Sequence, residues 1–274
     1  MDQRYATSPE QIPGLDTAEL RQRYLVGNLF VPGEINLTYT HHDRIVLGGV
    51  MPAGQALTLP TYAELRTDYF LAGREIGIVN IGGVGVITAD GVAYEMPTGA
   101  CLYIGRGTRE VIFADAGGAA QFYLFSATAH TTHPTTRVLS GEGNVLELGD
   151  QVTSNERTIH QLIHAGGVQS CQVVMGVTIL APGSMWNTMP AHRHDRRTEC
   201  YLYFDLPPEA RIVHLMGEPK ETRHLLVADR QAVISPSWSV HCGVGTAAYA
   251  FVWAMAGENK EFADMDPCPP ADLL

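Results

Sequence analysis

The stretch AHRHDRRTECYLYFDL, residues 191–206, holds two histidines two positions apart, a glutamate five residues further on, and then an apolar, aromatic run. On a β-strand, side chains at positions i and i+2 leave the same face, so His192 and His194 point the same way. The offset to Glu199 is odd, and an unbroken strand would put it on the opposite face. We therefore expect a turn or bulge at DRRT, residues 195–198, that brings the three side chains together.

The two-residue period of a strand sorts the residues after this turn into two faces. One face carries Glu199, Tyr201 and Tyr203, and the other carries Cys200, Leu202 and Phe204. Cys200 is therefore expected in the core rather than among the ligands of a site. Cys242 is interpreted in the same way.

A divalent metal ion requires three or four donors that converge on one point. The local stretch provides three, and SPSWSVHCGVG, residues 235–245, offers His241 before a glycine-rich turn. The H-x-H spacing alone is a weak signal. Together with Glu199 and the later P-x-W-x-x-H it predicts a metal site formed by His192, His194, Glu199 and His241. The other eight histidines are expected to bind backbone carbonyls or to lie in solvent.

The rest of the chain is dominated by short β-rich runs that glycine, proline, asparagine or aspartate separate, which is typical of an all-β sandwich or barrel. ADG, residues 89–91, predicts a hairpin turn between two of them. Near the start, Thr17 is expected to cap a helix with Leu20, Tyr24 and Leu25 on one side. Residues 154–163 are compatible with either a strand or a short helix.

Two series of such runs meet near residue 140, and they resemble each other weakly. GREIGIVNIGG, residues 73–83, can be laid on residues 197–206 so that Glu75 falls on Glu199. IGRGTRE can be laid on SPSWSVH so that Glu110 falls on His241, and Asp68 and Phe70 then fall where the H-x-H histidines stand. Chance similarity between short β-rich segments is the competing explanation.

This similarity is interpreted as an internal duplication. It predicts an N-terminal half, residues 1–140, without metal ligands, and a C-terminal metal-binding half, residues 141–274. Glu75 and Glu110 are then either remnants of a lost site or ordinary surface charges.

The composition narrows the possible partners. The 274 residues include 29 acidic and 18 basic side chains, a formal net charge of −11 that disfavours nucleic acid as a partner. No apolar run is long enough for a membrane span, and the first 25 residues lack the apolar core of a secretory signal. Five cysteines without a C-x-x-C pair indicate reduced thiols and a cytoplasmic protein.

The pattern His192-x-His194-x4-Glu199, followed by Pro236-x-Trp238-x-x-His241, resembles the two-part metal motif of cupins, with Trp238 where a glycine is usual. This departure puts the shape of the local turn in question, but not the ligand. More closely, nearly the whole chain resembles the bacterial 5-keto-4-deoxyuronate isomerases, also called 4-deoxy-L-threo-5-hexosulose-uronate ketol-isomerases. The segments that carry the resemblance include HHDRIVLGGVMP, REIGIVNIGGVGVITADG, TSNERTIHQ, WNTMPAHRHDRRTECYLYF, GEPKETRHLLV and AVISPSWSVHCGVGTAAYAFVWAMAGEN.

The resemblance implies a double-barrel (bicupin) β-sandwich or jelly roll with a few short helices, one bound zinc per chain, and a homo-oligomer that is a hexamer in the family. It also implies an aldose–ketose isomerisation of a small sugar acid, 5-keto-4-deoxyuronate to 3-deoxy-D-glycero-2,5-hexodiulosonate, in the breakdown of pectin-type uronates.

Such a reaction needs a proton-transfer group near the reacting carbons, unless hydride moves between them directly. Tyr201 and Glu221 are the candidates for that group, and a hydrogen-bonded wall residue is the alternative reading of each. The substrate carboxylate suits a guanidinium. Arg223 is the first candidate and Arg157 the second, although any single arginine can equally be a surface charge. Trp186 and Asn187 lie just before the candidate ligands in sequence, and they are further candidates for contacting and orienting the sugar.

Two other functions use the same residues. Three histidines and one glutamate also hold iron in cupin dioxygenases, which oxygen consumption with Fe(II) would reveal. A non-catalytic cupin would bind a sugar acid without turning it over. From the residues alone the isomerase and the dioxygenase stand nearly level, and the full-length resemblance favours the isomerase.

Overall fold

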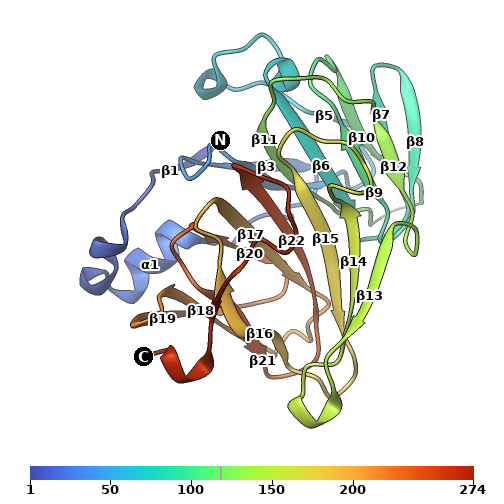
Figure 1. The fold of residues 1–274 in the computed structure, drawn as a ribbon. Coiled ribbons are helices and arrows are strands. Elements are labelled where there is room, and N and C mark those ends of the chain that lie inside the picture. Colours follow the sequence, from blue (N-terminus) through green and yellow to red (C-terminus); the bar gives the residue numbers. More distant parts are fainter. Residues whose placement is uncertain (118) are drawn as a thin grey trace.

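The first half of the chain folds into one large and one small sheet. The computed structural model describes residues 1–117 and 119–274, drawn in Figure 1. The large sheet runs in the order β1 (Asp2–Arg4), β3 (Glu34–Thr40), β4 (Val46–Met51), β11 (Phe122–Thr128), β6 (Arg74–Asn80), β9 (Cys101–Ile104), β12 (Thr136–Val138). The small sheet runs β5 (Leu57–Thr58), β10 (Val111–Asp115), β7 (Gly85–Ala89), β8 (Val92–Met96). We call this pair the first sandwich.

The remaining strands form a second sandwich. Its large sheet runs β13 (Asn144–Leu148), β14 (Arg157–Ile163), β15 (Val174–Leu180), β22 (Ala250–Gly257), β17 (Arg197–Phe204), β20 (Gln231–Ser235), β2 (Leu25–Val26). Its small sheet runs β19 (Glu221–Val227), β18 (Ile212–Glu218), β21 (His241–Gly245), β16 (Trp186–Arg193), β23 (Asp266–Cys268). The helical elements are α1 (Thr17–Tyr24) and short 3-10 helices at Pro9–Gly14, Ala63–Leu65, Phe70–Ala72, Gln151–Thr153 and Pro270–Asp272.

The strand period explains how the four sheets stack. Tyr123 and Phe125 of β11 share a buried cluster with Cys200 and Leu202 of β17, so the two large sheets pack face to face. The alternate residues of the same strands face the other way, into the interior of their own sandwich. The expected all-β double sandwich with few short helices is confirmed, as is the place of Cys200 in the core.

The two sandwiches repeat one strand order, β4-β11-β6-β9 in the first and β15-β22-β17-β20 in the second. The residue-level alignment, however, is wrong at Glu75. Ile76 and Ile78 of β6 face the interior of the first sandwich, so Glu75 faces the second sandwich, whereas Glu199 faces its own sandwich interior. A shift of one residue turns every side chain to the opposite face. Glu110 is exposed, in accord with an ordinary surface charge.

Glu75 is fully buried and joins the two sandwiches. Its Oε2 accepts hydrogen bonds from the Tyr103 hydroxyl and the Cys171 N–H, both at 2.7 Å. Its Oε1 accepts from the N–H groups of Gln172 at 2.7 Å and Val173 at 2.8 Å. Four donors compensate the cost of burying the carboxylate. Glu75 is therefore neither a remnant of a metal site nor a surface charge.

The segment between β1 and β3 packs on the second sandwich. The helix cap is Asp16 rather than Thr17, because the Asp16 carboxylate accepts from the Glu19 N–H at 2.9 Å and Thr17 already lies inside α1. Leu20 and Tyr24 are buried as expected. Figure 1 shows α1 beside β20, the strand on whose free edge β2 pairs.

Two further local predictions are settled by the backbone. ADG forms the β7–β8 hairpin, with Asp90 and Gly91 at φ of 45° and 81°, as this turn type requires. The undecided stretch 154–163 contains strand β14, whose register is fixed by pairing with both β13 and β15. Among the helices of the described residues, none has both the length and the apolar character that a membrane crossing needs.

Candidate metal centre

Two neighbouring strands place the first two donors side by side. In the β16–β21 ladder His192 lies directly opposite His241. The register of this ladder shifts between Asn187 and His192, and Thr188 adopts a left-handed φ of 51° within the irregular stretch. Irregularities of this kind re-aim the side chains that follow them. The turn that contains Trp238 forms, with the Ser239 N–H donating to the Pro236 carbonyl at 2.9 Å.

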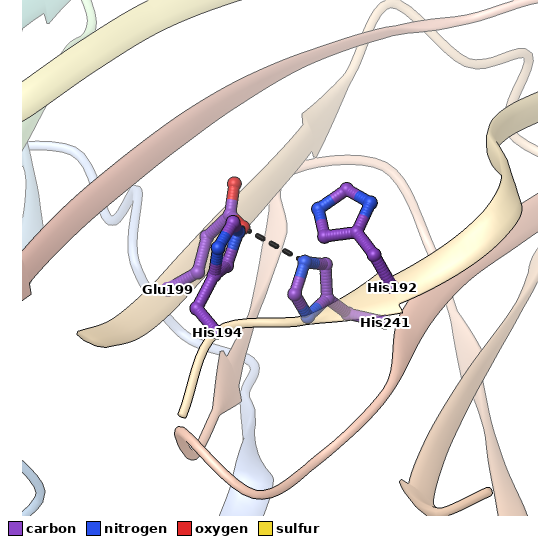
Figure 2. Close-up of side chains that lie close together, drawn as sticks. All are labelled: His192, His194, Glu199 and His241. Atoms are coloured by element: carbon purple, nitrogen blue, oxygen red, sulfur yellow. Dashed lines mark hydrogen bonds and ion pairs between the residues drawn. The ribbon is translucent and has the colours of Figure 1, made fainter. Parts of the chain in front are cut away.

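The predicted turn after His194 is confirmed. The Arg197 N–H donates to the His194 carbonyl at 3.0 Å, and β17 begins at Arg197. Glu199 then enters the interior of the second sandwich on the same side as the histidines, as Figure 2 shows. Because the chain turns between His194 and Glu199, their side chains reach the same side although their separation in sequence is odd.

The four predicted donors converge in one cluster, in which His192 is partly buried and the other three are buried. One ligand atom from each of His192, His194, Glu199 and His241 lies within 4.8 Å of the other three. Glu199 Oε2 is 3.1 Å from His194 Nε2 and 2.9 Å from His241 Nε2. The His192 ring centroid is 4.7 Å from that of His194 and 4.6 Å from that of His241. This cluster could hold a metal ion, since three imidazoles and one carboxylate are a donor set that Zn²⁺ and Fe²⁺ both accept.

In His194 and His241, Nδ1 contacts groups outside the cluster, so Nε2 is the nitrogen that faces it. His194 Nδ1 is 2.8 Å from the Asp264 carbonyl oxygen. His241 Nδ1 is 3.3 Å from both the Ser239 carbonyl oxygen and the Ser235 hydroxyl. A neutral imidazole that donates through Nδ1–H has its lone pair on Nε2, which is the form that coordination of a cation requires, whereas in the metal-free protein Nε2 lies at hydrogen-bond distance from Glu199 Oε2.

Electrostatics keep two of the donors, His192 and Glu199, in their metal-binding forms. Burial and the neighbouring His241 and His194 lower the pKa of His192 to about 2, so its ring is neutral at physiological pH. Burial alone would raise the pKa of Glu199, but the charge and hydrogen bonds of His241 and His194 outweigh it and hold that pKa well below its ordinary value. A neutral imidazole and an ionised carboxylate are the forms that coordinate a cation.

The cluster opens into a cavity of about 250 Å³. Its polar lining comprises His192, His194, Glu199, Tyr201, Arg157, Thr178 and Thr188. Its apolar lining comprises Leu148, Ile159, Met189, Pro190, Phe251, Trp253, Met255, Phe262 and Met265. The cavity therefore combines a cluster of donors, a single guanidinium and a mostly apolar wall, as expected for a site that binds a small charged molecule.

Of the residues predicted for catalysis and substrate binding, the cavity contains Tyr201 and Arg157. The Tyr201 hydroxyl lies 3.4 Å from the Thr188 hydroxyl, and its ring centroid is 5.6 Å from that of His241. The Arg157 Nη1 donates to the Asn155 carbonyl at 2.8 Å, and Arg157 is part of the cavity lining.

The other four predicted residues lie outside the cavity lining. Glu221 is exposed where β19 begins, opposite Glu218 in the hairpin. Arg223 donates through Nη2, at 3.1–3.2 Å, to two carbonyls of the 3-10 helix near the N-terminus and to that of Leu15, which follows it. Asn187 is buried and donates to the Tyr249 hydroxyl at 2.6 Å. Trp186 lies at the start of β16, paired with Val244.

Comparison with known proteins agrees with this geometry. Residues 26–267 match the model of the KduI/IolB family. The chain belongs to this family. It is 64% identical to a protein of Kineococcus radiotolerans and 53% identical to one of Bacillus pumilus, in both cases over 100% of each chain. Both relatives bear the name 4-deoxy-L-threo-5-hexosulose-uronate ketol-isomerase.

Solved structures share the fold of this KduI/IolB family member. An IolB-like protein from Salmonella typhimurium superposes with a TM-score of 0.73, at 16% identity, over 89% of this chain and 96% of the other. An oxalate decarboxylase from Lactobacillus farciminis superposes with a TM-score of 0.57, at 10% identity, over 79% and 78%. At these identities the likeness concerns the fold alone.

Sequence reasoning missed several residues of the cavity in this family member. Phe251, Trp253 and Met255 alternate along β22 and share the face of Tyr201, so their two-residue period was a usable signal. Phe262 and Met265 lie in an irregular segment, where no period marks the inward side. Asp264, whose carbonyl meets His194, contacts it through the backbone, which residue type does not reveal.

Proposed function

We propose that the protein is a metal-dependent ketol isomerase. It converts 4-deoxy-L-threo-5-hexosulose uronate to 3-deoxy-D-glycero-2,5-hexodiulosonate, an aldose–ketose isomerisation in the catabolism of uronates and pectin. The observation that carries the proposal is the four-donor cluster at the end of a cavity with one guanidinium, in a chain whose full-length relatives bear the name of this isomerase.

The metal we propose is zinc, one ion per chain, held by His192, His194, Glu199 and His241. Three neutral imidazoles and one carboxylate leave a divalent ion with a net charge of about +1, which suits an anionic sugar derivative. When bound, such an ion supplies Lewis-acid polarisation of the carbonyl that is isomerised. The buried, preformed donor cluster supports this assignment.

Arg157 is proposed to bind the substrate carboxylate. Its guanidinium borders the cavity, and one of its nitrogens is already fixed by the Asn155 carbonyl. A planar guanidinium can bind both carboxylate oxygens and so orient the sugar along the cavity. We place this role on Arg157 rather than on Arg223, whose guanidinium is engaged by backbone carbonyls elsewhere.

Tyr201 is proposed to donate a hydrogen bond to a substrate oxygen. Burial, followed by the charge of Glu199, raises the pKa of this phenol well above its ordinary value. The hydroxyl therefore carries its proton at neutral pH and acts as a donor rather than as a base. The apolar wall around it excludes water and strengthens this bond.

We further propose that the chain divides near residue 140 into an N-terminal half without metal ligands and a C-terminal metal-binding half. The strand order supports this division, apart from α1 and β2, which pack on the second sandwich. A cytoplasmic homohexamer is the assembly and location that the family resemblance implies.

The test is an assay of purified protein on 4-deoxy-L-threo-5-hexosulose uronate, with metal content measured on the same sample. We expect turnover with about one zinc per chain, and loss of both in His192→Ala. His224→Ala is the matched control, because this histidine is exposed on β19 and should alter neither quantity. A fully metallated protein without turnover would overturn the substrate assignment, and oxygen uptake with Fe(II) would point to oxygenase chemistry instead.

A further inference from the structure

An irregular segment between β22 and β23, residues 258–265, runs beside the candidate metal centre, and we call it the strap. Two of its side chains, Phe262 and Met265, line the cavity. The Phe262 ring centroid lies 5.5 Å from that of Trp253, which also lines the cavity. The strap therefore completes the enclosure of the proposed substrate site.

The strap is bound to the turn that carries His194. The Asp264 carboxylate accepts from Arg196 Nε at 3.0 and 2.7 Å and also from Arg196 Nη2. Asn259 Nδ2 donates to the same carboxylate at 2.6 Å. Asp266 makes a longer contact, with both oxygens 3.3 Å from Arg196 Nη2. A guanidinium held by several charge-assisted bonds is a geometrically specific anchor.

The backbone carbonyl of the same residue, Asp264, meets the metal centre. It lies 2.8 Å from His194 Nδ1, and it also accepts from Arg197 Nη2 at 2.8 Å. Arg197 is almost fully buried and extends behind the His194 ring, with Nη2 3.1 Å from Nδ1. This one carbonyl therefore serves both a candidate ligand and a buried cation.

We propose that Asp264 is a positioning residue for the metal centre: its carboxylate, held by Arg196, fixes its own carbonyl where it orients the His194 ring. The inference rests on the proposed metal site and extends it to residues outside the ligand set. When His194 coordinates through Nε2, its Nδ1 carries the proton and donates it to this carbonyl. If the bonds between the Asp264 carboxylate and Arg196 are lost, the strap can shift, and the His194 ring is no longer held by the Asp264 carbonyl.

The arrangement also couples the metal to the substrate. The strap that orients His194 is the one that carries Phe262 and Met265 against the cavity. A substrate that packs on these two side chains stabilises the strap in the conformation in which Asp264 contacts Arg196 and His194. This conformation in turn favours retention of the metal. By linkage, the coupling is reciprocal in binding free energy, so substrate raises the affinity for the metal by the same factor by which the metal raises the affinity for substrate.

The test compares Asp264→Ala with Asp266→Ala. Both variants remove a carboxylate that contacts Arg196, but only Asp264 offers its carbonyl to His194. We measure the rate at which zinc-loaded protein releases zinc to a chromogenic chelator. Asp264→Ala is expected to release zinc about 10–100-fold faster than wild type, and Asp266→Ala less than about threefold faster. In the metal-free state the two variants should unfold at similar temperatures.

A second readout separates positioning from general loosening. Substrate should slow zinc release from wild type but not from Asp264→Ala, and the KM of this variant should rise together with its release rate. If Asp264→Ala does not fold, Asp264→Asn keeps the side-chain size and carries the same expectation at smaller magnitude.

Equal release rates for the Asp264 and Asp266 variants would overturn the inference. A wild-type chain that binds no zinc would overturn both this inference and the proposed centre. Zinc-loaded wild type without isomerase turnover would overturn only the proposed reaction, because the release rates would still decide the role of Asp264.

Discussion

Replacing Glu75 by glutamine tests how strongly a single carboxylate joins the two sandwiches. The amide can keep one acceptor oxygen toward the N–H groups of Gln172 and Val173, but its NH2 group must then face the Cys171 N–H, so one buried donor loses its partner. An unsatisfied buried donor costs about 1–3 kcal/mol, and bonds to a neutral acceptor are each weaker than bonds to a charged one. Relief of the charge's desolvation offsets part of this loss.

We therefore expect the free energy of unfolding to fall by about 2–4 kcal/mol, or the midpoint of thermal unfolding by roughly 3–7 °C in a chain of this size. The assay is thermal and urea unfolding of metal-free protein, followed by circular dichroism and by tryptophan fluorescence. Glu110→Gln is the matched control, because the same change on an exposed side chain should leave the midpoint unchanged. A Glu75→Gln midpoint equal to that of the control would refute the view that this carboxylate holds the sandwiches together.

Three further predictions concern the centre and its pH dependence. Tyr201→Phe removes the proposed donor and should lower kcat roughly 10²-fold with zinc content unchanged, whereas unchanged kcat would exclude the role. Arg157→Lys loses the planar fork and should raise KM about 10-fold, equivalent to about 1.4 kcal/mol, with a smaller effect on kcat, as steady-state kinetics will show. Burial lowers the pKa of His42 to about 4 and of His214 to about 3, so only the unfolded chain binds these protons just below pH 6.5. The free energy of unfolding of metal-free protein should therefore fall as the pH drops from 6.5 to 4, by up to about 1.4 kcal/mol per pH unit for each histidine, and His42→Asn should flatten the urea-unfolding profile.

The cluster of four candidate metal ligands was the part of the molecule most open to prediction from sequence. The parity of the strand places His192 and His194 together, and the odd offset to Glu199 demands the turn that the structure contains. The same parity put Cys200 in the core. These inferences succeed because they depend on local backbone geometry, which a short stretch of sequence determines.

The predictions that failed depend on contacts between distant segments. Glu75 was laid on Glu199 by residue similarity, but its face is set by the packing of one large sheet on the other. Arg223 looked available for a substrate, yet the N-terminal 3-10 helix lies against it, more than two hundred residues away in sequence. The Thr17 cap was misplaced by one residue because Asp16 and Thr17 are both good caps and only the capping-box spacing to Glu19 distinguishes them.

Strand β2 comes from the N-terminal half of the chain but completes a sheet of the second sandwich, so the two halves are not independent domains joined by a linker. A strand from the beginning of the chain closes the edge of a sheet that otherwise belongs to its end, by pairing Leu25 with Val233 and Val26 with Ala232. A fragment cut out at residue 141 would carry all four candidate ligands but would leave the outer edge of β20 bare, together with the apolar face that meets the first sandwich. Such an edge invites pairing with another chain, so the fragment would aggregate although its chemistry is complete. The N-terminal half, which lacks candidate metal ligands, therefore protects the C-terminal half from self-association by covering this strand edge and this apolar face.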